Sequence, residues 1–107
     1  MKKTLFTLCT AFMLANLNAG AQSLQEGINH LYADRFKSAE QTFQKILAAN
    51  PNVIEASYWL GQTYLDKDDN DAARQLYDKA LAASNNAPLI MVGKGHVLLL
   101  DKKFDEA

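Results

Sequence analysis

Oxygen-bearing side chains alternate at Asp66, Asp68 and Asn70, a spacing that could hold a calcium ion. A calcium-binding EF-hand loop beginning at Asp66 needs glycine at its sixth position and glutamate at its twelfth. Asp71 and Tyr77 occupy those two positions. This stretch is therefore interpreted as a solvated turn followed by the start of a helix, and it predicts no metal site.

The other residues with potential for chemistry do not form a constellation. In the repeat described below, His30 takes the position of Tyr64, whereas His96 takes that of Gln62, so the two histidines differ in phase. Nucleophilic catalysis needs a nucleophile, a base and an orienting group together. Cys9 is the single cysteine, and no glycine-rich phosphate loop or serine elbow is present in the sequence. We expect no enzyme activity, no catalytic, cofactor-binding or metal-ligating residues, and no small-molecule substrate.

Small and apolar residues recur along the chain at one fixed interval, which we call the repeat period. Three sets share this interval: Gly27, Gly61 and Gly95; Leu31, Leu65 and Leu99; and Ala39, Ala73 and Ala107. The run KILAA at 45–49 also returns one period later as KALAA at 79–83. A fixed period of this length indicates a stacked array of structural repeats. The expected copies span residues 22–53, 54–87 and 88–107, the last of them incomplete.

Apolar spacing within each copy predicts two helices joined by a short turn. The expected helices cover 24–33, 36–49, 53–66, 71–83 and 87–100, followed by a turn at Lys102-Lys103 and a sixth helix that begins at Phe104. The fifth helix would leave Leu98 and its neighbours uncovered, whereas terminal repeats normally carry a polar cap. We therefore expect these 107 residues to be the front of a longer protein.

The recurring small residues have a role in packing two helices together. Helix axes come to about 8 Å only where the side chains at the contact are small. Three pairs are expected to face each other across helix pairs: Gly27 with Ala39, Gly61 with Ala73, and Gly95 with Ala107.

The middle copy resembles the tetratricopeptide repeat. The family pattern has Leu-Gly, a tyrosine three residues later, then a small residue and an aromatic four positions after it; the matching residues are Leu60, Gly61, Tyr64, Ala73 and Tyr77. Ser57 and Asn85 depart from the family's leading tryptophan and terminal proline. The resemblance implies an all-α solenoid of antiparallel helix pairs that acts as a protein-interaction scaffold.

The resemblance also implies which residues meet a partner, because first helices line the concave face in this family. By matching phase these are Leu24, Ile28, Tyr32, Tyr58, Trp59, Gln62, Asp66, Val92, His96 and Leu100. Some members bind acidic tails through a clamp of basic residues and asparagine. The matching positions here hold Leu24, Ile28, Trp59, Leu89 and Gly93. An apolar or aromatic segment of a protein partner is therefore favoured over an acidic tail.

Residues 1–21 are interpreted as a secretory signal peptide. Lys2 and Lys3 precede an apolar core from Leu5 to Ala15, and Ala19-Gly20-Ala21 forms a small-x-small cleavage site. The apolar core is shorter than the roughly 20 residues that span a bilayer, so contact with a membrane is expected only during export. This segment predicts a bacterial protein that is exported to the periplasm or secreted.

Charge narrows the class of partner. The net charge of −1 becomes −3 when Lys2 and Lys3 leave with the signal peptide, and no basic stripe remains. Nucleic-acid binding is not expected, because it needs such a stripe. Two functions follow: a non-enzymatic scaffold in the cell envelope, or the N-terminal docking module of a longer exported enzyme or assembly factor.

Overall fold

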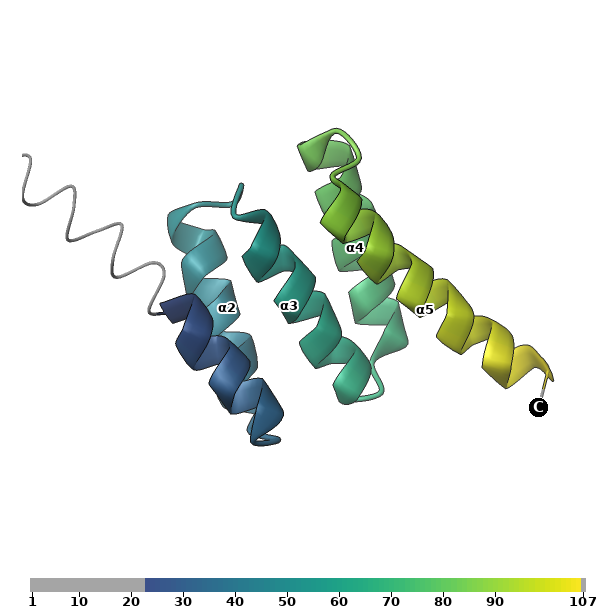
Figure 1. The fold of residues 1–107 in the computed structure, drawn as a ribbon, viewed down its shortest axis with the longest axis horizontal. Coiled ribbons are helices and arrows are strands. Elements are labelled where there is room, and N and C mark those ends of the chain that lie inside the picture. Colours follow the sequence, from purple (N-terminus) through teal and green to yellow (C-terminus); the bar gives the residue numbers. More distant parts are fainter. Residues whose placement is uncertain (1–22, 107) are drawn as a thin grey trace, which may run out of the picture.

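The computed structural model describes residues 23–106, and within that range every regular element is a helix (Figure 1). A first helix covers residues 23–32. It is followed by α2 (Phe36–Ala49), α3 (Ile54–Asp66), α4 (Asn70–Ser84) and α5 (Pro88–Glu106). The predicted all-α fold is confirmed, and the observed bounds of α2 match the expected 36–49.

Consecutive helices run in opposite directions and lie side by side as an array. The first helix lies beside α2, and α3 lies between α2 and α4 (Figure 1). Helix α5 packs against both α4 and α3. Because α3 is covered from several sides, its buried residues do not form one stripe; they are Ala56, Ser57, Leu60, Gly61, Thr63 and Leu65.

The hydrophobic core consists of two clusters that follow the repeat period of the sequence. The first contains Leu31, Ala39, Phe43, Ile46, Ala56 and Leu60. The second contains Leu65, Ala73, Tyr77, Ala87, Ile90 and Val97. Four members of one cluster lie a single period from a member of the other: Leu31 and Leu65, Ala39 and Ala73, Phe43 and Tyr77, and Ala56 and Ile90. The period therefore reflects two equivalent core sites, each built around one aromatic ring.

The aromatic rings, rather than the alanines, are the nearest neighbours of the repeat glycines. A Cβ at Gly27 would overlap the ring of Phe43, and one at Gly61 would overlap the ring of Tyr77. Ala39 and Ala73 are themselves fully buried. Glycine is required at both positions because the ring of the second helix occupies the space that a side chain would need.

The expected pair of Gly95 with Ala107 lies partly outside the residues that the structure describes. A Cβ at Gly95 would meet no atom within 4 Å, and its expected partner Ala107 lies outside the described residues. Gly93 makes the close approach instead, against the ring of Tyr77. Gly93 and the fully buried Val97 lie on the packed side of α5, and Gly95 lies on another side of this helix.

The turns within the first two helix pairs share the same backbone conformation and hydrogen bond. Asp34 and Asp68 have positive φ values of 59° and 61°. The amides of the next residues, Arg35 and Asp69, donate to carbonyl oxygens five positions back, at 2.9 Å in both turns. This left-handed helix ending satisfies free carbonyls, and aspartate tolerates its backbone conformation better than most side chains do.

The turn expected at Lys102-Lys103 is wrong, because α5 continues as a helix to Glu106. Asp34 and Asp68 adopt positive φ in the two earlier turns, and one repeat period further on the same position is Lys102. Lysine pays a larger steric cost in the left-handed region and has good helix propensity. Phe104, the expected start of a sixth helix, therefore belongs to α5.

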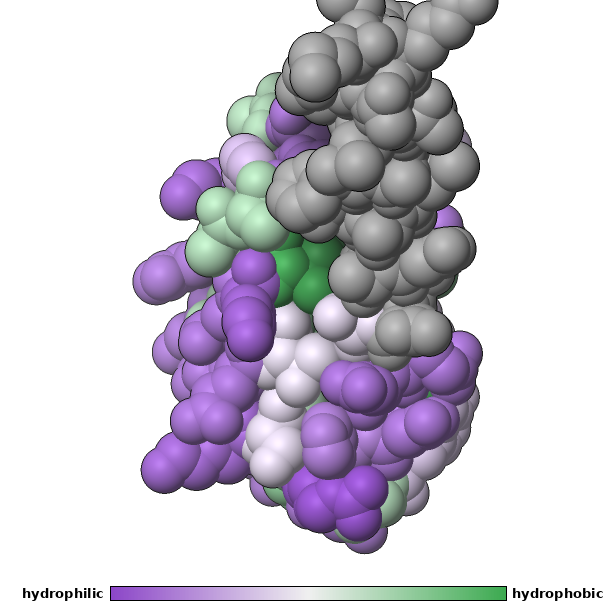
Figure 2. Space-filling view, turned by 90° about the vertical axis from the view of Figure 1, so that its left-hand side faces the viewer, coloured by the Kyte–Doolittle hydropathy of each residue, from purple (hydrophilic) through white to green (hydrophobic). Residues whose placement is uncertain are grey.

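The predicted signal peptide at 1–21 lies outside the described residues. Among the helices of 23–106, none combines the length and apolar character needed to cross a membrane. Seen from the side of the first helix and α2, the described surface is mostly hydrophilic, with a small hydrophobic area (Figure 2).

Candidate partner-binding surface

Three aromatic side chains from two helix pairs meet on the side formed by the first helix and α3. Tyr32 and Trp59 have ring centroids 6.3 Å apart in an edge arrangement. Tyr58 and Trp59 lie 5.3 Å apart at 76°. Tyr32 is 76% exposed, whereas Tyr58 and Trp59 are partly buried. We call these three residues the aromatic cluster; it combines one exposed ring with two partly buried rings.

The side chain of Tyr77, on α4, holds Tyr58 of this cluster in place. Its hydroxyl donates to the carbonyl oxygen of Tyr58 at 2.7 Å and accepts from Nε2 of Gln62 at 3.0 Å. Burial raises the pKa of the Tyr77 hydroxyl far above its usual range, and the hydrogen bond from Gln62 opposes this only in part. The hydroxyl therefore stays protonated and remains a donor. The sequence marked Tyr77 as a repeat aromatic but did not indicate this positioning role.

Gln62 extends the polar contacts to α5. Nδ1 of His96 lies 3.2 Å from Oε1 of Gln62. Because an amide oxygen only accepts, Nδ1 of His96 carries the proton in this contact. Gln62 thus joins a residue of α4 to a residue of α5 through one side chain, so the predicted residues Tyr58, Gln62 and His96 form one connected surface.

A cavity of about 370 Å³ opens beside the aromatic cluster. Five residues predicted for the concave face line it: Tyr32, Tyr58, Trp59, Gln62 and Asp66. Leu31 and Asp34 complete the lining, and the sequence pattern predicted a binding role for neither of them. Leu31 belongs to a set of apolar residues that recurs with the repeat period, which indicates a core position. Asp34 lies in the turn between two expected helices. Neither pattern indicates contact with a partner.

The electrostatics of this cavity centre on Asp66. Partial burial raises the pKa of its carboxyl group, His96 lowers it, and the neighbouring carboxylates of Asp34 and Asp68 raise it further. The net direction is upward, so holding Asp66 in its charged form is unfavourable relative to a free carboxylate.

The other residues predicted for the concave face differ in how much of each side chain is exposed. Leu24 and Ile28 pack on the first core cluster, and Leu100 packs on the second. Val92 is 61% exposed and lies on α5 with the exposed His96. Leu24, Ile28 and Leu100 are thus partly buried, as Tyr58 and Trp59 are, whereas Val92 and His96 are exposed.

The two histidines have separate partners. Nε of Arg35 donates to Nδ1 of His30 at 3.0 Å, whereas His96 contacts Gln62. Over residues 23–106 no group of three or more histidine, cysteine or carboxylate side chains is arranged to hold a metal ion.

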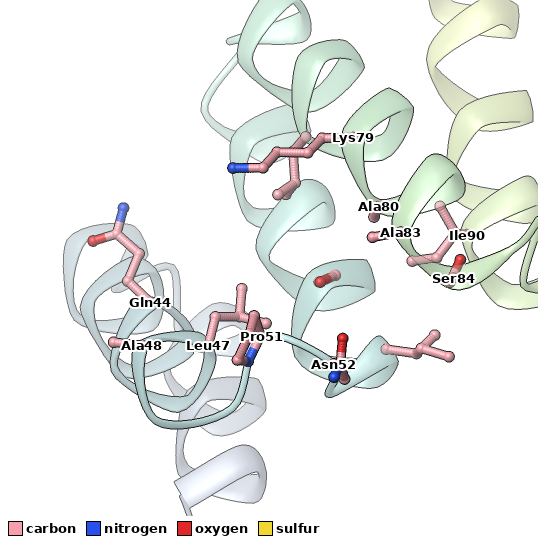
Figure 3. A pocket seen from close by; sticks show the side chains of 13 residues that line it. Gln44, Leu47, Ala48, Pro51, Asn52, Lys79, Ala80, Ala83, Ser84 and Ile90 are labelled. Carbon is pink, nitrogen blue, oxygen red and sulfur yellow. The ribbon is translucent and has the colours of Figure 1, made fainter.

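A larger cavity of about 510 Å³ lies on the other side of α3, between α2 and α4. Figure 3 shows Gln44, Leu47 and Ala48 on one side of it and Lys79, Ala80 and Ala83 on the other. Its lining is dominated by alanine and other aliphatic side chains. Five polar residues add hydrogen-bonding groups to this apolar lining: Gln44, Asn52, Ser57, Lys79 and Ser84.

The described residues form two stacked helix pairs, and α5 follows them in the position of the first helix of a third pair. The core recurs with the repeat period. These features define a helical-repeat protein of the α-solenoid type. The sequence pattern of the tetratricopeptide repeat matches residues 24–88, and the chain belongs to this family. Repeats of this family generally mediate protein–protein interactions. A comparison with curated proteins finds no match to the chain.

Proposed function

We propose that this chain is a protein-interaction module of the bacterial cell envelope that binds an apolar or aromatic segment of a partner protein. The aromatic cluster of Tyr32, Tyr58 and Trp59 carries the proposal. Tyrosine and tryptophan dominate the energetics of protein interfaces because each buries a large area and keeps a polar tip. Here they occupy the side formed by the first helices of two successive pairs.

The cluster has the rigidity that such a contact needs. Trp59 packs on the first core cluster, and Tyr58 is held through its backbone carbonyl by Tyr77. A surface that is already ordered before binding loses less conformational entropy when the partner arrives. This favours the aromatic cluster as the site of contact.

Charge disfavours an acidic partner. Asp34 and Asp66 line the cavity beside the cluster, so an acidic segment would meet like charge there. The positions of the family's basic clamp hold Trp59 and Gly93 among other uncharged residues. We therefore infer a partner segment that is apolar or aromatic rather than an acidic tail.

Export is the basis for placing the protein in the envelope. Cleavage after Ala21 would leave a mature chain that begins with Gln22. Mass spectrometry of the periplasmic and secreted fractions should detect that terminus. Retention of Met1, or recovery of the protein in the cytoplasm alone, would contradict an envelope role and leave the interaction surface to be tested separately.

The interaction itself is tested by affinity capture with the full-length protein. Capture from a periplasmic extract, followed by calorimetry with the purified partner, should show that Trp59→Ala costs about 2 kcal/mol or more. Lys79→Ala and Ala83→Trp, which alter the lining of the larger cavity, serve as controls and should have small effects. Loss of binding in Ala83→Trp with unchanged binding in Trp59→Ala would move the site to the larger cavity.

A further inference from the structure

The cavity beside the aromatic cluster combines aromatic walls with two carboxylates. Tyr32 and Trp59 form one wall in their edge arrangement, and Asp34 and Asp66 also line the space. The faces of aromatic rings carry partial negative charge. A ring face turned toward the cavity would add to the negative potential of the two carboxylates.

No basic side chain is paired with these carboxylates in the part of the chain that the structure describes. The ion pairs found there use Glu40, Asp71, Asp78 and Asp101. Arg35 follows Asp34 in the sequence, yet its Nε donates to His30. Partial burial is the main cause of the raised pKa of Asp66; among its charged neighbours His96 lowers that pKa, and Asp34 and Asp68 raise it. The cavity therefore holds negative charge that is not fully compensated.

From this charge pattern we infer that the cavity binds the side chain of a lysine or arginine of the partner segment. Its ammonium or guanidinium group would lie between Asp34 and Asp66, and its alkyl stem against Tyr32 and Trp59. A cation over an aromatic ring gains electrostatic attraction, and long basic side chains bury their stems on apolar surface. This inference rests on the proposed function and adds a basic residue to the apolar or aromatic partner segment.

Within residues 23–106 this arrangement occurs at one interface between helix pairs. The position of Trp59 is occupied one repeat period later by Gly93, which packs on the ring of Tyr77. The side chain that forms the wall of the cavity is thus absent from the equivalent position on α5. One basic residue per partner segment is expected at this surface.

The test begins with random dodecapeptides displayed on phage and selected on the full-length protein, with Trp59→Ala for counter-selection. The selected peptides should contain lysine or arginine beside apolar or aromatic residues. Replacing that basic residue with norleucine, which keeps most of the stem, should weaken binding about tenfold. In the double variant Asp34→Asn, Asp66→Asn the same replacement should have less than about twofold effect, since the cation has lost its carboxylates.

The variants are chosen to preserve the fold. Asparagine tolerates the positive φ of residue 34, and thermal melts should show that the double variant is folded. Glu55→Gln removes a carboxylate from the opposite end of α3 and should leave the norleucine effect unchanged. Trp59-dependent peptides that bind equally well with norleucine would overturn this inference while leaving the proposed function standing. Failure to obtain any Trp59-dependent peptide would overturn both.

Discussion

Gly61 lies against the ring of Tyr77, so closely that a Cβ on Gly61 would overlap the ring. The same relationship joins Gly27 to Phe43 in the first helix pair. Each pair therefore depends on a glycine in its first helix and an aromatic ring in its second. In the second pair the Tyr77 side chain also contacts the proposed binding surface, because its hydroxyl donates to the backbone carbonyl of Tyr58.

Replacing glycine with alanine adds one methyl group, and its effect on stability distinguishes a glycine that lies against an aromatic ring from one that does not. Gly61→Ala should destabilise the protein by about 1–3 kcal/mol, because Tyr77 is fully buried and has little space to move. Gly95→Ala meets no neighbour and should stabilise α5 by about 0.5–1 kcal/mol through helix propensity. Urea unfolding of the two variants measures both. Equal changes in stability would contradict the packing described here.

Removing the Tyr77 hydroxyl tests its bonds to Tyr58 and Gln62. Tyr77→Phe leaves a buried carbonyl and an amide without this partner, and the expected cost is about 1–2 kcal/mol. Chemical denaturation at neutral pH gives the value. Stability unchanged within error would show that water or another group replaces the hydroxyl.

Alkaline unfolding provides a separate test of the same residue. The pKa of Tyr77 is raised in the folded state, so its contribution is fully present below the ordinary tyrosine pKa of 10.0. Above that pH the unfolded chain loses the proton while the folded chain keeps it, and stability falls. The slope of stability against pH above 10 should be smaller in Tyr77→Phe than in the unaltered protein. Identical slopes would mean that the hydroxyl is not buried as described.

The turn at Asp68 tests why α5 continues past the expected turn. Asp68→Lys should destabilise the α3–α4 pair by about 1 kcal/mol, because a lysine would have to adopt positive φ there. Asp68→Gly should be neutral or stabilising, and Asp68→Asn controls for loss of charge. Thermal unfolding ranks the three variants. If lysine and glycine were tolerated equally, the identity of residue 102 would not explain the continuous helix.

Sequence periodicity was sufficient for the fold because core positions repeat. Phe43 and Tyr77 mark equivalent core sites, and apolar spacing placed α2 and α3 to within one residue. The phase argument did not identify Gly93, since it assumed that every first helix packs its glycine on its own second helix. Close approach to the preceding pair, as Gly93 makes to Tyr77, depends on how the pairs stack and leaves no periodic signal.

Only part of the arrangement at the proposed binding surface could be predicted from helical periodicity. Tyr32, Tyr58 and Trp59 could be placed on one face by helical phase. Asp34 could not, because it lies in a turn, and its place in the cavity follows from the three-dimensional path of the chain. Leu24 and Ile28 share the phase of the surface residues and, like Trp59, are partly buried against the first core cluster.

The most direct test of the proposed surface uses the single tryptophan of the chain. Protein labelled with 5-fluorotryptophan gives one fluorine NMR resonance, from residue 59, whatever the composition of the partner. Titration with the captured partner should shift or broaden this resonance in step with the binding measured by calorimetry. Binding observed by calorimetry with an unchanged Trp59 resonance would show that the partner lies elsewhere on the protein.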